Sequence, residues 1–147
     1  MSFGDLPAWA TGLSNSIRLL VHGDKDGDFF PAVLLRRDPL FDQLIVNRYQ
    51  PGEGICAHVD LLRFEDGIAV VSLESSCVMD FSKVDEGNRC EPNRFPVFLA
   101  PGSLILMSGE ARYQWKHEIN RSLGFQIWEG QEIDQQRRTS VTLRRLC

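Results

Sequence analysis

The sequence contains three histidines, His22, His58 and His117, so a metal site built on imidazole must use these residues. His58 and Asp60 form an H-x-D pair in a segment that favours a strand, where residues two apart point to the same side. Both side chains can therefore ligate one ion. His22 and Asp24 form a second H-x-D pair, but it follows a helix in a polar, glycine-containing turn that does not orient a ligand.

A metal held only by His58 and Asp60 needs a further protein ligand, and His117 is the remaining candidate. Two histidines and one carboxylate are the ligand set of non-haem iron oxygenases, which leaves open positions on the metal. Those positions suit a bidentate cosubstrate and dioxygen. The alternative is that His58 and His117 are ordinary histidines satisfied within strands.

The segment 138–144 places polar side chains on one face of a strand: Arg138, Ser140, Thr142 and Arg144. Two arginines on a buried face are costly unless an anion lies there. The dicarboxylate 2-oxoglutarate would fit, because a guanidinium pairs bidentately with a carboxylate. The alternative is a basic outer face, since Arg137 and Arg145 lie on the opposite side of the same strand.

A second strand carries neutral hydrogen-bonding groups of the kind that orient a bound acid. Asn47 and Tyr49 share one face, and Arg48 points the other way. An amide and a phenol on an inward face can position a carboxylate or keto acid.

The elements expected to position these residues are one helix and about eight strands. The helix spans 5–21, capped by Asp5, with an apolar face of Leu6, Trp9, Leu13, Ile17 and Leu20. The strands are rich in β-branched and aromatic residues and are separated by glycine- and proline-containing turns. They are Leu44–Gln50, Cys56–Asp60, Ile68–Leu73, Cys77–Phe81, Phe95–Leu99, Leu104–Ser108, Leu123–Trp128 and Thr139–Arg144. This pattern predicts a mainly β jelly roll or sandwich with the helix packed outside.

The 147 residues fit one domain, 1–147, with a helix and a short lid-like segment in 1–43 and a jelly-roll core in 44–147. A hydrophobic content of 43% excludes a disordered chain, and a net charge of −4 excludes a broad surface for polyanions. No apolar stretch approaches the roughly 20 residues of a membrane span. We therefore expect a soluble cytoplasmic or nuclear protein with no membrane association. The four cysteines include no CxxC pair and are expected to be reduced.

Five sequence blocks, in order, resemble those of the AlkB-like Fe(II)/2-oxoglutarate-dependent dioxygenases. They are Asn47-Arg48-Tyr49-x-Pro51-Gly52-x-Gly54-Ile55, His58-x-Asp60, Pro101-Gly102-Ser103-Leu104, Gly109-Glu110-x-Arg112-Tyr113-x-Trp115-x-His117 and Arg138-x-Ser140-x-Thr142-x-Arg144. The similarity extends from about Leu44 to Arg145. Around 109–117 it is greatest to the animal-type member that hydroxylates the modified wobble uridine of transfer RNA.

The resemblance implies a double-stranded β-helix, the jelly roll of this family, and assigns roles to the candidate residues. His58, Asp60 and His117 would bind Fe(II). Arg138 would pair with the distal carboxylate of 2-oxoglutarate, helped by Tyr49, and Asn47 would lie near its metal-bound end. Ser140 would line the same cofactor site, and Arg144 would hold Asp60 in its ligating orientation. The implied reaction is hydroxylation or oxidative demethylation with dioxygen as cosubstrate.

The substrate is less constrained than the cofactors. Base-demethylating members of the family usually continue H-x-D with acidic residues, whereas this chain continues with Leu61 and Leu62, which argues against DNA repair. We therefore expect a nucleic-acid base in RNA, with a partner protein as a potential source of RNA binding. The alternatives are the same chemistry on a protein side chain or small molecule, and a jelly-roll binding module without catalysis.

Overall fold

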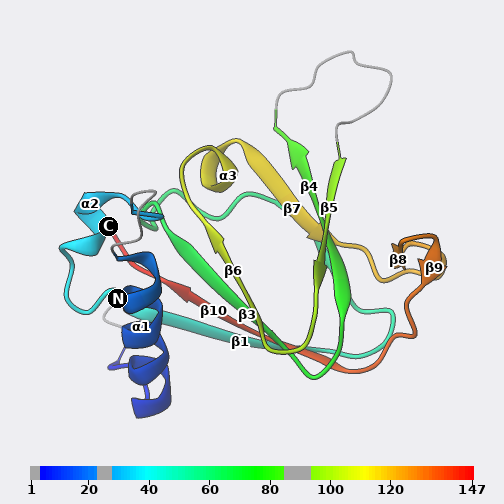
Figure 1. Cartoon of the computed structure of the whole chain (residues 1–147), viewed down its shortest axis with the longest axis horizontal. Coiled ribbons are helices and arrows are strands. Elements are labelled where there is room, and N and C mark those ends of the chain that lie inside the picture. Colours follow the sequence, from blue (N-terminus) through cyan, green and yellow to red (C-terminus); the bar gives the residue numbers. More distant parts are fainter. Residues whose placement is uncertain (1–3, 23–27, 85–93) are drawn as a thin grey trace.

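The structure is a computed structural model that describes residues 4–22, 28–84 and 94–147. Its elements, in chain order, are α1 (Ala8–Val21), α2 (Ala32–Leu35), β1 (Gln43–Tyr49), β2 (Ile55–His58), β3 (Ile68–Leu73), β4 (Cys77–Lys83), β5 (Arg94–Leu99), β6 (Ser103–Met107), α3 (Gly109–Tyr113), β7 (Trp115–Ile119), β8 (Ile127–Trp128), β9 (Gln131–Glu132) and β10 (Arg138–Arg144). Figure 1 shows the strands as the body of the molecule, with α1 beside β1 and β10.

Two four-stranded sheets, with orders β1-β10-β3-β6 and β2-β7-β4-β5, contain most of the strands, and β8 and β9 form a small hairpin. All the strand pairs are antiparallel. The expectation of a mainly β jelly roll with an N-terminal helix is therefore confirmed. No helix in the described parts of the chain is long and apolar enough to cross a membrane.

Two apolar clusters lie on opposite faces of the β1-β10-β3-β6 sheet. The outer cluster joins α1 and α2 to the sheet through residues such as Ile17, Leu34 and Leu143. The inner cluster lies between the two sheets and includes Val70 and Met79. The period of two along each strand separates these faces, so helix packing uses one set of side chains and leaves the other for the interior.

The helix expected over 5–21 begins later, and its buried face is shifted from the expected one, with Ile17 and Leu13 common to both. α1 starts after Pro7, and Asp5 does not cap it. Its buried residues are Ala10, Ser14, Ile17 and Val21. The predicted apolar face was therefore wrong at Trp9, which is 53% exposed, and at Leu20, which is 62% exposed. The buried residues are those on the side of the helix that contacts the sheet. The small side chains of Ala10 and Ser14 allow the helix to pack closely there.

The strand pattern differs from the expectation in the second half of the chain. β7 was not predicted, although it carries His117 between its mixed charged and apolar neighbours. The strand expected over Leu123–Trp128 is reduced to Ile127–Trp128. Gly124 has a φ of +84°, which is incompatible with a regular strand, and the buried Gln126 side chain bonds to both backbone groups of Val78 instead.

Cys56, Cys77 and Cys147 are free thiols, and Cys90 lies outside the described residues.

Candidate active site

Strands β2 and β7 bring two histidines from distant parts of the sequence together. His58 is the register partner of His117, and their ring centroids lie 4.2 Å apart. Gly54, just before β2, makes this pairing possible: a Cβ at this position would lie 2.0 Å from the carbonyl oxygen of Ile119 in β7. Only glycine permits such a close approach of the two backbones.

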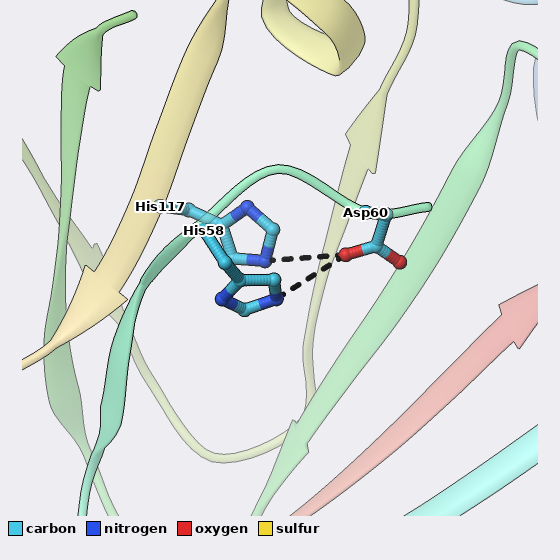
Figure 2. Close-up of side chains that lie close together, drawn as sticks. All are labelled: His58, Asp60 and His117. Atoms are coloured by element: carbon cyan, nitrogen blue, oxygen red, sulfur yellow. Dashed lines mark ion pairs between the residues drawn. The ribbon is translucent and has the colours of Figure 1, made fainter. Parts of the chain in front are cut away.

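Asp60 follows β2 and directs its carboxylate at both imidazoles (Figure 2). Its Oδ1 lies 3.3 Å from Nε2 of His58 and 3.7 Å from Nε2 of His117. Its Oδ2 accepts a hydrogen bond of 2.9 Å from Nη1 of Arg144 in β10. The ligand atoms of His58, Asp60 and His117 all lie within 4.8 Å of one another, which is compact enough for one metal ion.

The protonation states of Asp60 and His117 suit metal binding. Burial alone would raise the pKa of Asp60, but hydrogen bonds from His58 and Arg144 outweigh it and lower the pKa to about 2. Burial, followed by the charge of His58, lowers the pKa of His117 to about 4. At neutral pH, Asp60 is thus a carboxylate and His117 a neutral imidazole, the forms that coordinate metals.

His58 is the most accessible member of this group, with a side chain 37% exposed. Its Nδ1 lies 2.8 Å from the carbonyl oxygen of Cys56. Because Nδ1 donates to this carbonyl, Nε2, which hydrogen-bonds to Asp60 in the metal-free protein, is the nitrogen available to a metal once it is deprotonated. The hydrogen bond with Asp60, opposed by burial, raises the pKa of His58.

These side chains open onto a cavity of about 180 Å³ between the two sheets. By the same measure, a single water needs only about 10–15 Å³, so a small organic acid has room. The strand β10 lines the cavity with Arg138, Ser140, Thr142 and Arg144, and β1 contributes Asn47 and Tyr49. The β1–β10 register pairs Tyr49 with Arg138 and Asn47 with Ser140, so all the cofactor residues expected from the sequence meet in one place.

Arg138 is the buried cation of this cavity. It is 2% exposed, its Nε donates a 3.0 Å hydrogen bond to Ser72 Oγ, and its guanidinium lies over the Tyr49 ring at 5.6 Å. Its Nη2 has no hydrogen-bond partner, and within the described residues no carboxylate forms an ion pair with it. A buried, unpaired guanidinium is expensive, so the geometry fits a site for an anion.

Comparisons with known proteins agree with this combination of ligands and buried arginine. Residues 6–144 match the family model described as the 2OG-Fe(II) oxygenase superfamily. The chain belongs to this superfamily. Its members are dioxygenases, and hence oxidoreductases, that use Fe(II) and 2-oxoglutarate.

Among its relatives within the 2OG-Fe(II) oxygenases is the tRNA (carboxymethyluridine(34)-5-O)-methyltransferase alkbh8 of Xenopus tropicalis. It is 44% identical over 105 residues, covering 68% of this chain and 15% of the relative. The alkylated DNA repair protein ALKBH8 homolog of Arabidopsis thaliana is 32% identical over 118 residues, covering 71% of this chain and 34% of the relative. The chain thus spans about a third or less of these relatives and is an AlkB-like oxygenase domain.

The solved structure of OsALKBH1 has the same fold. It superposes with a TM-score of 0.60 at 15% identity, covering 95% of this chain and 64% of that one. At this identity the similarity shows the architecture alone.

The cavity of this 2OG-Fe(II) oxygenase domain also fits the family's cofactors by its own chemistry. An ionised Asp60 and a neutral His117 face His58 for the metal, and the unpartnered Arg138 Nη2 suits a carboxylate. His22 lies elsewhere, at the end of α1, where it faces Asp28 at 3.7 Å and is 56% exposed. Its H-x-D partner Asp24 lies outside the described residues.

Sequence reasoning missed two contributors to this site. Ser72 of β3 accepts the Arg138 Nε–H bond, but a lone serine in an apolar strand gives no signal of that role. Arg112 of α3 contacts the backbone of the segment after Asp60. Arg112 belongs to the sequence block 109–117 that resembles the family, but the block does not indicate that its side chain contacts the backbone after Asp60.

Proposed function

We propose that residues 1–147 form one Fe(II)- and 2-oxoglutarate-dependent oxygenase domain with His58, Asp60 and His117 as its metal ligands. The observation that carries the proposal is that these ligand atoms, within 4.8 Å of one another, share a cavity with the unpartnered guanidinium of Arg138. Residues 44–147 supply this cavity, and 1–43 supply the helix that covers the outer face of the sheet.

In this arrangement the chain's own groups bind and orient the cosubstrate. Arg138 binds the distal carboxylate of 2-oxoglutarate beside Tyr49, and Asn47 and Ser140 lie along the cavity toward the ligand group. Arg144 holds Oδ2 of Asp60, which keeps Oδ1 toward the histidines. The Fe(II) bound there would supply the activation of dioxygen.

The overall reaction balances without another reductant. One oxygen atom of dioxygen enters the new carboxylate of succinate as 2-oxoglutarate loses carbon dioxide, and the other enters a substrate C–H bond to give an alcohol. If that carbon is a methyl group on nitrogen, the alcohol decomposes to formaldehyde and the demethylated base.

We propose a nucleic-acid base, in RNA rather than DNA, as the substrate. Support comes from the relative named for carboxymethyluridine 34 of tRNA, although this chain covers only 15% of it. Such a substrate would be met in the cytoplasm or nucleus. The chain's net charge is −4, and Arg112, Arg121, Arg138 and Arg144 lie at least partly in the interior, so a partner protein would add RNA affinity.

The same charge distribution supports a second candidate, in which the substrate is a protein side chain or a small molecule. A net acidic protein whose Arg112, Arg121 and Arg138 are buried repels a polyanion at long range.

The test is incubation of the protein with Fe(II), ascorbate, 2-oxoglutarate and total transfer RNA, followed by measurement of succinate and of modified nucleosides by mass spectrometry. We expect succinate formation that His58→Ala abolishes, together with a hydroxylated or demethylated nucleoside. Succinate without any change in RNA or DNA nucleosides would support the second candidate. Absence of both RNA-stimulated and uncoupled succinate would contradict the oxygenase proposal itself.

A further inference from the structure

Arg112 in α3 is a buried arginine that directs its charge at backbone carbonyls. The residue is 2% exposed, and none of the described carboxylates forms an ion pair with it. Its Nη1 donates to the carbonyl oxygen of Asp60 at 2.9 Å. Its Nη2 donates to the carbonyl oxygens of Leu61 at 2.8 Å and Phe64 at 3.2 Å. A single guanidinium therefore holds three carbonyls of the segment that carries a proposed metal ligand.

This segment needs such support because β2 ends at His58 and no strand pairing includes Asp60. The chain re-forms a backbone bridge only at Phe64, which pairs with Leu146. The Asp60 backbone thus lies outside both sheets. The Leu61 carbonyl also accepts from the Phe64 N–H, but the buried carbonyls of Asp60 and Phe64 would lack partners without an external donor. Arg112 supplies that donor.

The position of Arg112 in α3 links the Asp60 backbone to a second proposed metal ligand, His117. α3 ends at Tyr113 and leads directly into β7, which carries His117 five positions after Arg112. The bonds from Arg112 therefore tie the Asp60 backbone to the element that delivers His117. Arg144 fixes the Asp60 carboxylate from β10, so the two arginines act on different atoms of one residue.

We propose that Arg112 is a positioning residue that fixes Asp60 relative to His117 and thereby sets the geometry and affinity of the metal centre. This inference rests on the proposed metal site. Loss of the three bonds would let the 60–64 segment move, and a ligand that must be ordered on binding gives weaker coordination.

The test is calorimetric titration of the metal-free protein with Co(II), together with the visible d–d spectrum of the Co(II) complex and thermal unfolding. We expect Arg112→Met to weaken Co(II) binding by about 10–100-fold, the range found when groups that orient metal ligands are removed. The spectrum should also change, because the d–d bands respond to ligand geometry. Arg112→Lys should recover part of the affinity, since an ammonium still donates to a carbonyl.

Arg18→Met is the matched control. Arg18 of α1 also donates to two backbone carbonyls, those of Leu35 at 2.6 Å and Arg37 at 2.5 Å, and it does not line the cavity. We expect this variant to lower the melting temperature without changing Co(II) affinity or spectrum. A purely structural role of Arg112 would give the same pattern.

Three outcomes would overturn the inference, and they are distinguishable. If the wild-type protein binds Co(II) and a folded Arg112→Met variant binds it equally with an unchanged spectrum, the positioning role is wrong and the metal site stands. If Arg112→Met does not fold, Arg112→Gln takes its place, because the shorter, uncharged amide cannot make all three bonds. Wild-type affinity and spectrum in that variant would likewise show that the positioning role is wrong. If the wild-type protein does not bind Co(II), the proposed metal site fails and the role of Arg112 fails with it.

Discussion

Arg138 and Arg144 lie at the two ends of β10 on the same face, yet their surroundings differ. Arg144 meets a carboxylate of the chain itself, Asp60 Oδ2 at 2.9 Å. Among the described residues, Arg138 contacts the hydroxyl of Ser72 and the face of Tyr49, and its Nη2 finds no hydrogen-bond partner there. The first arginine completes an internal ion pair, whereas the second has a free hydrogen-bond donor, as the proposed binding of 2-oxoglutarate requires.

The largest expected effect comes from removing the arginine that lacks a carboxylate. Arg138→Met keeps an unbranched apolar stem but removes the guanidinium and its charge. Two charge-assisted hydrogen bonds of about 1.5–3 kcal/mol each would be lost, so binding of 2-oxoglutarate should weaken by at least about 100-fold. Metal affinity should not change, and stability should not fall, because an unpaired buried charge is removed. A variant that binds 2-oxoglutarate normally by calorimetry would contradict the role of Arg138.

Arg144→Met should give the opposite pattern. It leaves Oδ2 of the buried Asp60 without its donor, so metal affinity should fall by about 10–100-fold. The unfolding free energy of the metal-free protein, measured by urea denaturation, should fall by about 3–5 kcal/mol, as for other broken buried pairs. Destabilisation of Arg138→Met together with wild-type stability of Arg144→Met would contradict the assignment of Arg144, and not Arg138, to an internal ion pair.

Ser72→Ala tests how much the hydrogen bond to Ser72 contributes to the role of Arg138. The change removes the acceptor of the Arg138 Nε–H bond while leaving the guanidinium in place. Ser72 holds the guanidinium and does not line the cavity, so its loss acts on the cosubstrate indirectly. We expect a cost of about 1 kcal/mol in binding, which raises the KM for 2-oxoglutarate about fivefold. Metal affinity should match the wild type, and an equal loss of metal affinity would show that Ser72 acts through the general fold.

The smallest effect is expected at Arg137, next to Arg138 but on the other face. Arg137 is exposed and pairs with the partly exposed Glu74 through a bond of 2.6 Å. Arg137→Ala should leave 2-oxoglutarate binding, metal affinity and thermal stability unchanged within error, because exposed ion pairs contribute little. A large loss of 2-oxoglutarate binding would show that proximity in sequence, and not the inward face, decides the role.

The alternation along β10 is the part of the site that sequence predicts best, because a period of two follows directly from strand geometry. The same reasoning cannot tell Arg138 from Arg144. Their difference depends on Ser72 and Asp60, residues more than 60 positions away. Only the sheet order and register bring those partners to β10.

The missed strand β7 and the misplaced face of α1 have a related cause. Lys116 and Glu118 weaken the strand signal around His117, and pairing with β2 and β4 overrides that local preference. Ala10 and Ser14, rather than Trp9 and Leu20, face the sheet because the helix packs closely there. Neither fact is encoded in apolar spacing alone.

The shared cavity is tested most directly by calorimetric titration of 2-oxoglutarate into the protein without oxygen, with and without Fe(II). We predict saturable binding that requires Fe(II), is abolished in His58→Ala and is weakened at least about 100-fold in Arg138→Met. Each variant removes one part of the cavity and leaves the other intact: His58→Ala removes a proposed metal ligand, and Arg138→Met removes the proposed partner of the distal carboxylate. Failure of the Fe(II)-loaded protein to bind 2-oxoglutarate, or equal binding by the Arg138→Met variant, would contradict the proposed joint site for metal and cosubstrate.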